Sequence, residues 1–356
     1  MSTSRPTAAR ALETLSPAYF GMVMATGILS IASHMLGVGW LAHGLFVLNL
    51  ALYPLLGALY LLRLKRYPRA VAADLGDHLR GPGYFTVVAA TGVLGSQCLL
   101  LAGSLAPGLL LWGLAALLWL FFTYAIFTLL TIKEAKPALD RGINGGWLLA
   151  VVATQSVAVL SALLAARIGQ PWKLEMNLLA LSMWLWGGML YIWMMSLIFY
   201  RYTFFRFRPD DLAPPYWINM GAMAISTLGG SLLIGNAAEA PFLHSLLPFL
   251  KGFTVFYWAT GTWWIPMLLV LALWRYACKR FPLKYDPLYW GAVFPLGMYA
   301  ASTHELVVAM DFPFLTTLPG VFLGTALLAW IAAFAGALRH AWHALAAGIR
   351  AGRPHN

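Results

Sequence analysis

The chain carries very little charge: only 10% of its 356 residues are Asp, Glu, Lys or Arg, whereas 61% are hydrophobic. A soluble domain of this size needs far more polar surface, so this composition excludes a soluble globular protein. Long apolar runs recur from one end to the other, which is typical of a helical protein that crosses a membrane many times. The first 14 residues contain no apolar segment of the kind found in a signal peptide, so we expect no cleaved signal.

Cysteine and acidic residues are also scarce. Cys98 lies in an apolar run and Cys278 in a basic loop, which indicates a packing residue and a free thiol rather than a disulfide. The apolar segments contain no His-Glu-x-x-His motif and no paired acidic residues, so we expect no catalytic residues, no metal site and no cofactor. A retinal protein is also disfavoured, because Lys251 begins an apolar segment instead of lying mid-membrane.

The sequence does contain ten apolar segments, each about 20–25 residues long. They are 15–36, 41–62, 82–103, 107–131, 144–166, 176–200, 213–236, 251–274, 287–308 and 315–338. Twenty of the 23 Lys and Arg residues fall in the N-terminal tail or after an even-numbered span. The positive-inside rule therefore places both termini in the cytoplasm. We predict one domain, 15–340, in the plasma (inner) membrane, with cytoplasmic tails 1–14 and 341–356. The basic loops are topology signals, so we expect no nucleic-acid partner.

An internal repeat joins the spans in pairs. PAYFGMVMATGILS (17–30) and PGYFTVVAATGVLG (82–95) share eight of 14 residues, and PLYWGAVFPLG begins at 287. Weaker matches begin at 145 and 214, so successive starts are 65, 63, 69 and 73 residues apart. A shared helix-start pattern explains Pro-x-Tyr-Phe but not the Val-x-Ala-Thr-Gly that follows. We predict an all-α integral membrane protein whose ten transmembrane helices form five parallel helical-hairpin repeats around a central pore.

The odd-numbered spans hold more glycine and small polar residues than the leucine-rich even spans, so we expect them to line the pore. Close helix packing is the alternative explanation for these small residues. Alignment of the repeats places Phe294 at the level of four smaller side chains. These are Met24, Ala89, Val152 and Gly221. Pro295 follows, and we expect it to remove a backbone hydrogen bond and to kink the helix. Phe294 and Pro295 suit an occluding gate, unless Phe294 is an ordinary core or lipid-facing residue.

Helical periodicity adds Gly297, Met298 and Ala301 on the ninth span as candidate pore residues. The hydroxyl residues Thr26, Thr91 and Thr154 on the first, third and fifth spans are further candidates. No Lys or Arg lies deep within an odd span, so an anion site would depend on backbone dipoles and hydroxyls. Glu305 lies close to the line of Phe294, and His304 is directed about 80° to the side. Both are candidates for coupling proton binding to transport, or are simply interfacial.

Five segments carry a resemblance to a known family. They are FGMVMATGILS (20–30), INGGWLLAVVATQS (143–156), YWINMGAMAIS (216–226), TGTWWIP (260–266) and YWGAVFP (289–295). Over about 15–340 the chain resembles the tellurite-resistance/dicarboxylate transporter family, which includes plant slow anion channels, bacterial tellurite-resistance homologues, fungal malate permeases and sulfite efflux pumps. The resemblance implies a homotrimer in the lipid bilayer, one pore per protomer, and a phenylalanine gate that is Phe294 here.

The resemblance also implies transport of small anions, C4-dicarboxylates such as malate and succinate or related oxyanions. Proton-coupled efflux of sulfite or tellurite is one alternative. Passive conduction of halide or nitrate is the other. A neutral pore fits all of these anions, so the sequence alone leaves the substrate and the energy coupling open.

Overall fold

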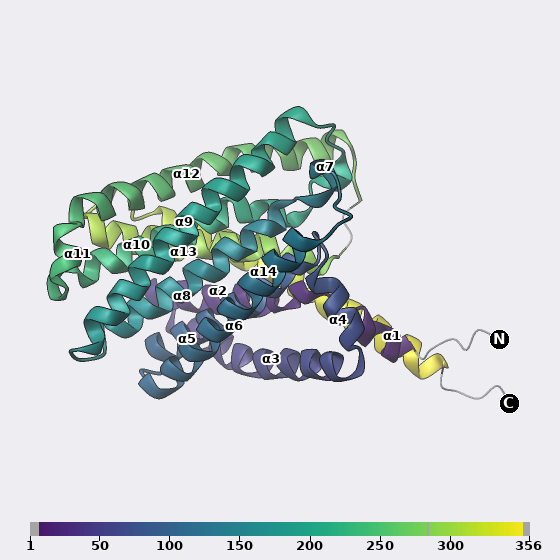
Figure 1. Cartoon of the computed structure of the whole chain (residues 1–356), viewed down its shortest axis with the longest axis horizontal. Helices are drawn as coiled ribbons and strands as arrows, with labels where there is room; N and C mark the ends of the chain where they lie inside the picture. The colour runs from purple at the N-terminus through teal and green to yellow at the C-terminus, as the bar shows by residue number, and fades with distance from the viewer. Residues whose placement is uncertain (1–6, 283–284, 352–356) are drawn as a thin grey trace.

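A computed structural model describes residues 7–282 and 285–351, and this part of the chain is helical without any strand (Figure 1). The helices are α1 (Thr7–Glu13), α2 (Gly21–Met35), α3 (Gly39–Arg66), α4 (Pro68–Leu75), α5 (Phe85–Leu100), α6 (Leu105–Ile132), α7 (Leu139–Gly142), α8 (Leu149–Ala165), α9 (Trp172–Phe204), α10 (Ile218–Asn236), α11 (Pro241–Ser245), α12 (Leu247–Leu273), α13 (Trp290–Met310) and α14 (Leu318–Ala351). The chain is therefore an all-α membrane protein, as predicted.

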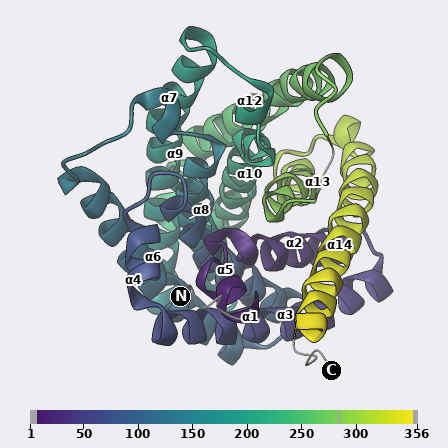
Figure 2. The ribbon, with the colours of Figure 1, turned by 90° about the vertical axis from the view of Figure 1, so that its right-hand side faces the viewer.

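Five helices form a closed ring, and five others surround it (Figure 2). The inner helices are α2, α5, α8, α10 and α13; each contacts the next one, and α13 contacts α2. The outer helices are α3, α6, α9, α12 and α14, and each packs against the inner helix that precedes it in the chain. The arrangement is five helical hairpins around one axis.

Burial distinguishes the two sets of helices. In the most apolar stretch of the inner helices α2, α5, α8 and α10, between 72% and 94% of residues are buried, against 17% to 50% in the outer helices. Large apolar side chains of the outer helices, such as Leu110 and Trp193, are exposed. An apolar exterior of this kind is expected where a protein faces lipid.

Nine of the described helices are long and apolar enough to cross a membrane. The exception among the predicted spans is α13, which has 21 residues but includes several polar ones, among them His304 and Glu305. These residues lower the mean hydropathy of α13, and its neighbours α2 and α10 shield it within the ring. The count of ten transmembrane helices stays a prediction.

A short 3₁₀ turn that begins with proline or glycine precedes every inner helix. The turns are Pro17–Phe20, Gly81–Tyr84, Gly145–Leu148, Pro214–Trp217 and Pro287–Tyr289. At three of them a side chain before the turn accepts a hydrogen bond from a backbone N–H. The acceptors are Ser16, Asn144 and Asp286. Proline at the start of a helix and a polar cap before it are both standard start signals, which explains why the repeated sequence places every inner helix at the same depth.

Hydrogen bonds from aromatic side chains join each outer helix to the inner helix of the next repeat. We call these five contacts the seams. Four involve an indole N–H, and one involves the Tyr53 hydroxyl. The pairs are Tyr53–Thr91 (2.8 Å), Trp119–Thr154 (2.8 Å), Trp184–Ser226 carbonyl (2.7 Å), Trp258–Thr303 (3.1 Å) and Trp330–Thr26 (2.9 Å). Every neighbouring pair of repeats is therefore tied by a polar bond that lipid cannot replace.

Candidate anion pathway

Two cavities lie on the axis of the ring, and each is lined by residues from all five repeats. The distal cavity lies toward the C-terminal ends of the inner helices and has a volume of about 170 Å³. The proximal cavity lies where the inner helices begin and has a volume of about 20 Å³. A water molecule takes up about 30 Å³ in the liquid, so the distal cavity has room for a small anion with some of its water.

The cavity walls follow the register of the sequence repeat. One layer of the proximal cavity is Gly21, Thr86, Leu149, Ile218 and Gly291, and these residues are equivalent in the repeat alignment. Two layers of the distal cavity are Ile28, Val93, Ser156, Ile225 and Met298, and then Met35, Leu100, Leu163, Leu232 and Glu305. Most of these residues are not among the pore residues predicted from the sequence, although extending the repeat register by one or two turns identifies them.

Phe294 belongs to the layer between the two cavities. It lines the proximal cavity with Met24 and is only 1% exposed. One turn further along α13, Met298 lines the distal cavity. The other residues of this layer are Met24, Ala89, Val152 and Gly221, of which only Met24 has a long side chain. We call it the gate layer, and Phe294 is its only ring.

Helix α13 runs through Pro295 without interruption. The proline ring packs against α10 at Gly221, where an added Cβ would lie 2.7 Å from Pro295 Cγ. In the same way, a Cβ on Gly297 would lie 2.7 Å from Leu29 Cδ1 on α2. Gly221 and Gly297 therefore allow close contact between inner helices. Ala89, Val152 and Ala301 are buried and line neither cavity.

The three threonines proposed as pore hydroxyls are directed away from the axis. Thr26, Thr91 and Thr154 take part in the seams, so their hydroxyls bond to Trp330, Tyr53 and Trp119 of the outer helices. Each threonine comes two residues after the gate layer, about 200° around the helix. These three hydroxyls therefore line neither of the two cavities.

Glu305 lines the distal cavity, whereas His304 does not. The four equivalent residues in its layer are apolar: Met35, Leu100, Leu163 and Leu232. Among the described residues Glu305 has no hydrogen-bond or ion-pair partner, and it is the one ionisable side chain of this cavity wall. A single carboxyl group in an apolar cavity is a candidate proton site.

The helix backbone is the nearest source of positive charge to the two cavities. In the described part of the chain, no Lys or Arg side chain lines either cavity. Ser96 and Ser156 line the distal cavity, and their hydroxyls donate to backbone carbonyls of their own helices. The inner helices begin at the proximal cavity, so the positive ends of five helix dipoles converge there.

One titratable group near the start of the inner helices adds no charge to this end. His78 precedes the turn at Gly81–Tyr84. Its burial, and secondly the neighbouring Lys133, hold the pKa of His78 below its usual value. The imidazole is therefore neutral at pH 7, and the fixed positive charge at this end comes from Lys and Arg.

Comparison with known proteins gives a consistent result. A family described as "Voltage-dependent anion channel" (SLAC1) matches residues 14–338. An uncharacterized transporter of Methanocaldococcus jannaschii is 27% identical over 298 residues, which cover 82% of this chain and 85% of that protein. An uncharacterized membrane protein of Mycobacterium tuberculosis is 39% identical over 152 residues, 42% of this chain and 76% of that protein.

Proposed function

The chain belongs to the voltage-dependent anion channel family, and we propose that it carries small anions, C4-dicarboxylates or related oxyanions, along the axis of its inner ring. One observation supports this path above all. Two cavities, each lined by all five repeats, lie in line with each other and are separated only by the gate layer.

We propose that Phe294 is the gate. Its phenyl ring closes a dry, apolar constriction, which an anion crosses only by losing water. The rest of the pathway attracts anions weakly, because it offers helix dipoles and no fixed cation. A weak site suits transport, since a tightly bound ion leaves slowly. The proline ring of Pro295 holds α13 against α10 next to the gate.

We further propose a homotrimer with one ten-span pathway per protomer, in the plasma (inner) membrane, with residues 1–14 and 341–356 in the cytoplasm. The trimer is suggested by the family resemblance alone. The orientation is supported by basic residues such as Lys65, Arg66 and Arg206, which lie at the end where the inner helices begin. These cations would raise the local anion concentration at the proximal cavity.

A flux panel in proteoliposomes tests this proposal. Malate, succinate, sulfite, nitrate and chloride are compared, each with and without a pH gradient. We expect at least one anion to move faster than in protein-free liposomes, with the C4-dicarboxylates fastest. Flux that follows the anion gradient alone indicates a channel, whereas uphill flux driven by a pH gradient indicates a proton-coupled transporter. Background flux for all five anions, with correctly folded protein, would contradict the proposal.

Proton coupling is the second candidate function, and the position of Glu305 favours it. An ionised carboxylate in the distal cavity repels an anion about 8 Å away by about 2 kcal/mol at an effective dielectric constant of 20. Protonation removes this repulsion, so anion flux is expected to rise as the pH falls.

Glu305→Gln tests this expectation directly. The amide cannot ionise, so we expect the variant to transport at high pH roughly thirty times faster than the unmodified chain, and to lose the rise in flux on acidification. Glu175→Gln is the matched control, because Glu175 is exposed at the start of α9, toward the distal end but outside the cavity. An unchanged pH profile in Glu305→Gln would rule out this role.

A further inference from the structure

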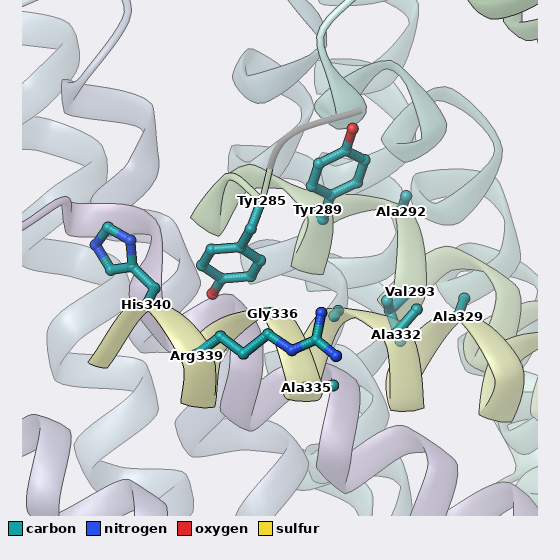
Figure 3. A pocket seen from close by; sticks show the side chains of 11 residues that line it. Tyr285, Tyr289, Ala292, Val293, Ala329, Ala332, Ala335, Gly336, Arg339 and His340 are labelled. Carbon is teal, nitrogen blue, oxygen red and sulfur yellow. The ribbon is translucent and has the colours of Figure 1, made fainter. Parts of the chain in front are cut away.

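A groove of about 760 Å³ lies outside the ring, between α13 and α14 (Figure 3). Small residues of α14 form one wall, among them Ala332 and Gly336, and Ala292 and Val293 of α13 form part of the other. Neighbouring side chains of α14, such as Ile331 and Leu338, are exposed and apolar. The groove therefore opens onto the surface that we expect to face lipid, and it is smooth enough to accept an acyl chain.

A basic side chain extends into this groove. Figure 3 shows the side chain of Arg339 running along α14 toward Ala332. Among the described residues it has no hydrogen bond and no ion pair, although it is a residue of a helix that is long and apolar enough to cross a membrane. Arg339 is exposed and directly follows the tenth predicted span, so its guanidinium lies at the membrane boundary, where the phosphate of an anionic lipid can pair with it.

The other four outer helices show that this situation is unusual within the fold. Each has a basic residue near its C-terminal end, and each of these residues donates to protein oxygens. They are Arg63 (to Asp74), Lys133 (to the Gly76 carbonyl), Arg201 (to Asp211) and Arg275 (to the Leu212 carbonyl). Arg339 is the fifth member of the set, and in the described part of the chain it alone lacks such an acceptor. The groove that Arg339 lines leaves room beside its guanidinium for a hydrogen-bond acceptor from outside the protein.

We propose that this groove binds one anionic phospholipid of the surrounding leaflet, with its phosphate on the Arg339 guanidinium and one acyl chain between α13 and α14. An arginine and a phosphate pair through two parallel N–H···O bonds, which explains a preference for an anionic headgroup. The groove wall at Ala292 and Val293 directly precedes Phe294, so a bound lipid supports the helix that carries the gate. The lipid site does not depend on the proposed function; only this effect on the gate does.

Lipid binding to the purified full chain tests the proposal without any measurement of transport. Native mass spectrometry of the chain in micelles counts phosphatidylglycerol and phosphatidylcholine bound at equal added concentrations. We expect the unmodified chain to bind phosphatidylglycerol about ten times more tightly than Arg339→Gln does. Ala332→Phe fills the groove at an exposed position, so it should reduce binding of phosphatidylglycerol without disturbing the core. Arg66→Gln, at the exposed end of α3, is the control and should bind like the unmodified chain.

Two kinds of outcome would overturn the lipid site. One is a failure of the binding measurement to show specificity: equal phosphatidylglycerol binding by Arg339→Gln, Ala332→Phe and the unmodified chain, or no preference over phosphatidylcholine. The other is a second copy of the chain in the groove, which Ala335→Cys would reveal as a disulfide between copies when Cys278 is replaced by serine. Ala335 lines the groove and is exposed, so the thiol introduced by Ala335→Cys would be accessible whether or not a second copy occupies the groove.

Discussion

Replacing Phe294 with alanine is expected to raise anion flux strongly, because the phenyl ring is the only bulky group that α13 contributes to the layer between the two cavities. Its equivalents in the first, third, fifth and seventh predicted spans are Met24, Ala89, Val152 and Gly221, so only the flexible Met24 side chain would remain at this level once the ring is removed. The proximal and distal cavities would then join. A barrier lowered by about 2–3 kcal/mol raises the rate roughly 30- to 150-fold. Anion flux into proteoliposomes, normalised to the amount of folded protein, measures this effect.

The control for this experiment must separate gating from loss of packing. A buried Phe→Ala change costs about 3–5 kcal/mol of stability wherever it is made. Phe85 on α5 is as buried as Phe294, at 1% exposure, but it packs toward Phe127 of an outer helix and lines neither cavity. Phe85→Ala should therefore lower stability and leave flux per folded molecule unchanged. If Phe294→Ala gave no more flux than Phe85→Ala, Phe294 would not be the gate.

Replacing Asp74 with alanine is expected to cause the largest loss of stability among single changes outside the ring. Asp74 accepts hydrogen bonds from Arg63 Nη2 at 2.7 Å and from Arg80 Nε at 2.6 Å. The side chain of Arg63 is 2% exposed and also donates to the Tyr84 hydroxyl. Without Asp74, a buried guanidinium loses its counter-charge, which costs about 3–5 kcal/mol. The free energy of unfolding in mixed micelles measures this loss.

An exposed ion pair of the same chain provides the comparison. Lys173 and Glu239 also form a salt bridge, but the side chain of Glu239 is 66% exposed. Water already solvates the Glu239 carboxylate, so Glu239→Ala should cost less than about 1 kcal/mol. Similar losses for Asp74→Ala and Glu239→Ala would mean that the cluster around Arg63 is not a main source of stability. Asp74→Asn should lie between them, because its amide oxygen still accepts a hydrogen bond.

The repeat in the sequence predicts more of the pathway than its individual motifs do. Offsets of 65, 63, 69 and 73 residues, applied to Ile28, identify Val93, Ser156, Ile225 and Met298, all of which line the distal cavity. The same arithmetic places Glu305 in a layer of apolar residues. Hydrophobic runs locate the helices but underestimate the longest ones: α9 covers Trp172–Phe204 rather than 176–200. Aromatic and basic residues at its ends continue the helix beyond the apolar stretch.

Other features depend on contacts that a single sequence does not reveal. Helical periodicity already indicates that Thr26 faces the side of its helix opposite to Met24, the gate-layer residue of that helix. It does not identify Trp330 as the partner of Thr26. The close contact of Pro295 with Gly221 likewise joins segments far apart in the chain. Arg339, which has no hydrogen-bond acceptor among the described residues, is recognised as unusual only by comparison with the hydrogen bonds of Arg63, Lys133, Arg201 and Arg275. Each of these depends on which helices become neighbours, which the order of apolar segments does not specify.

The five seams can form at different times during synthesis of the chain. Four of them join residues between 35 and 45 positions apart, so each can form soon after its hairpin has entered the membrane. The fifth, from Trp330 to Thr26, joins residues 304 positions apart. Helix α2 is among the first helices that the ribosome synthesises, yet its seam with α14 forms only after the last helix has been made. Throughout most of translation the growing chain is therefore an open arc. Helix α13 closes the inner ring against α2, and only the arrival of α14 adds the last seam.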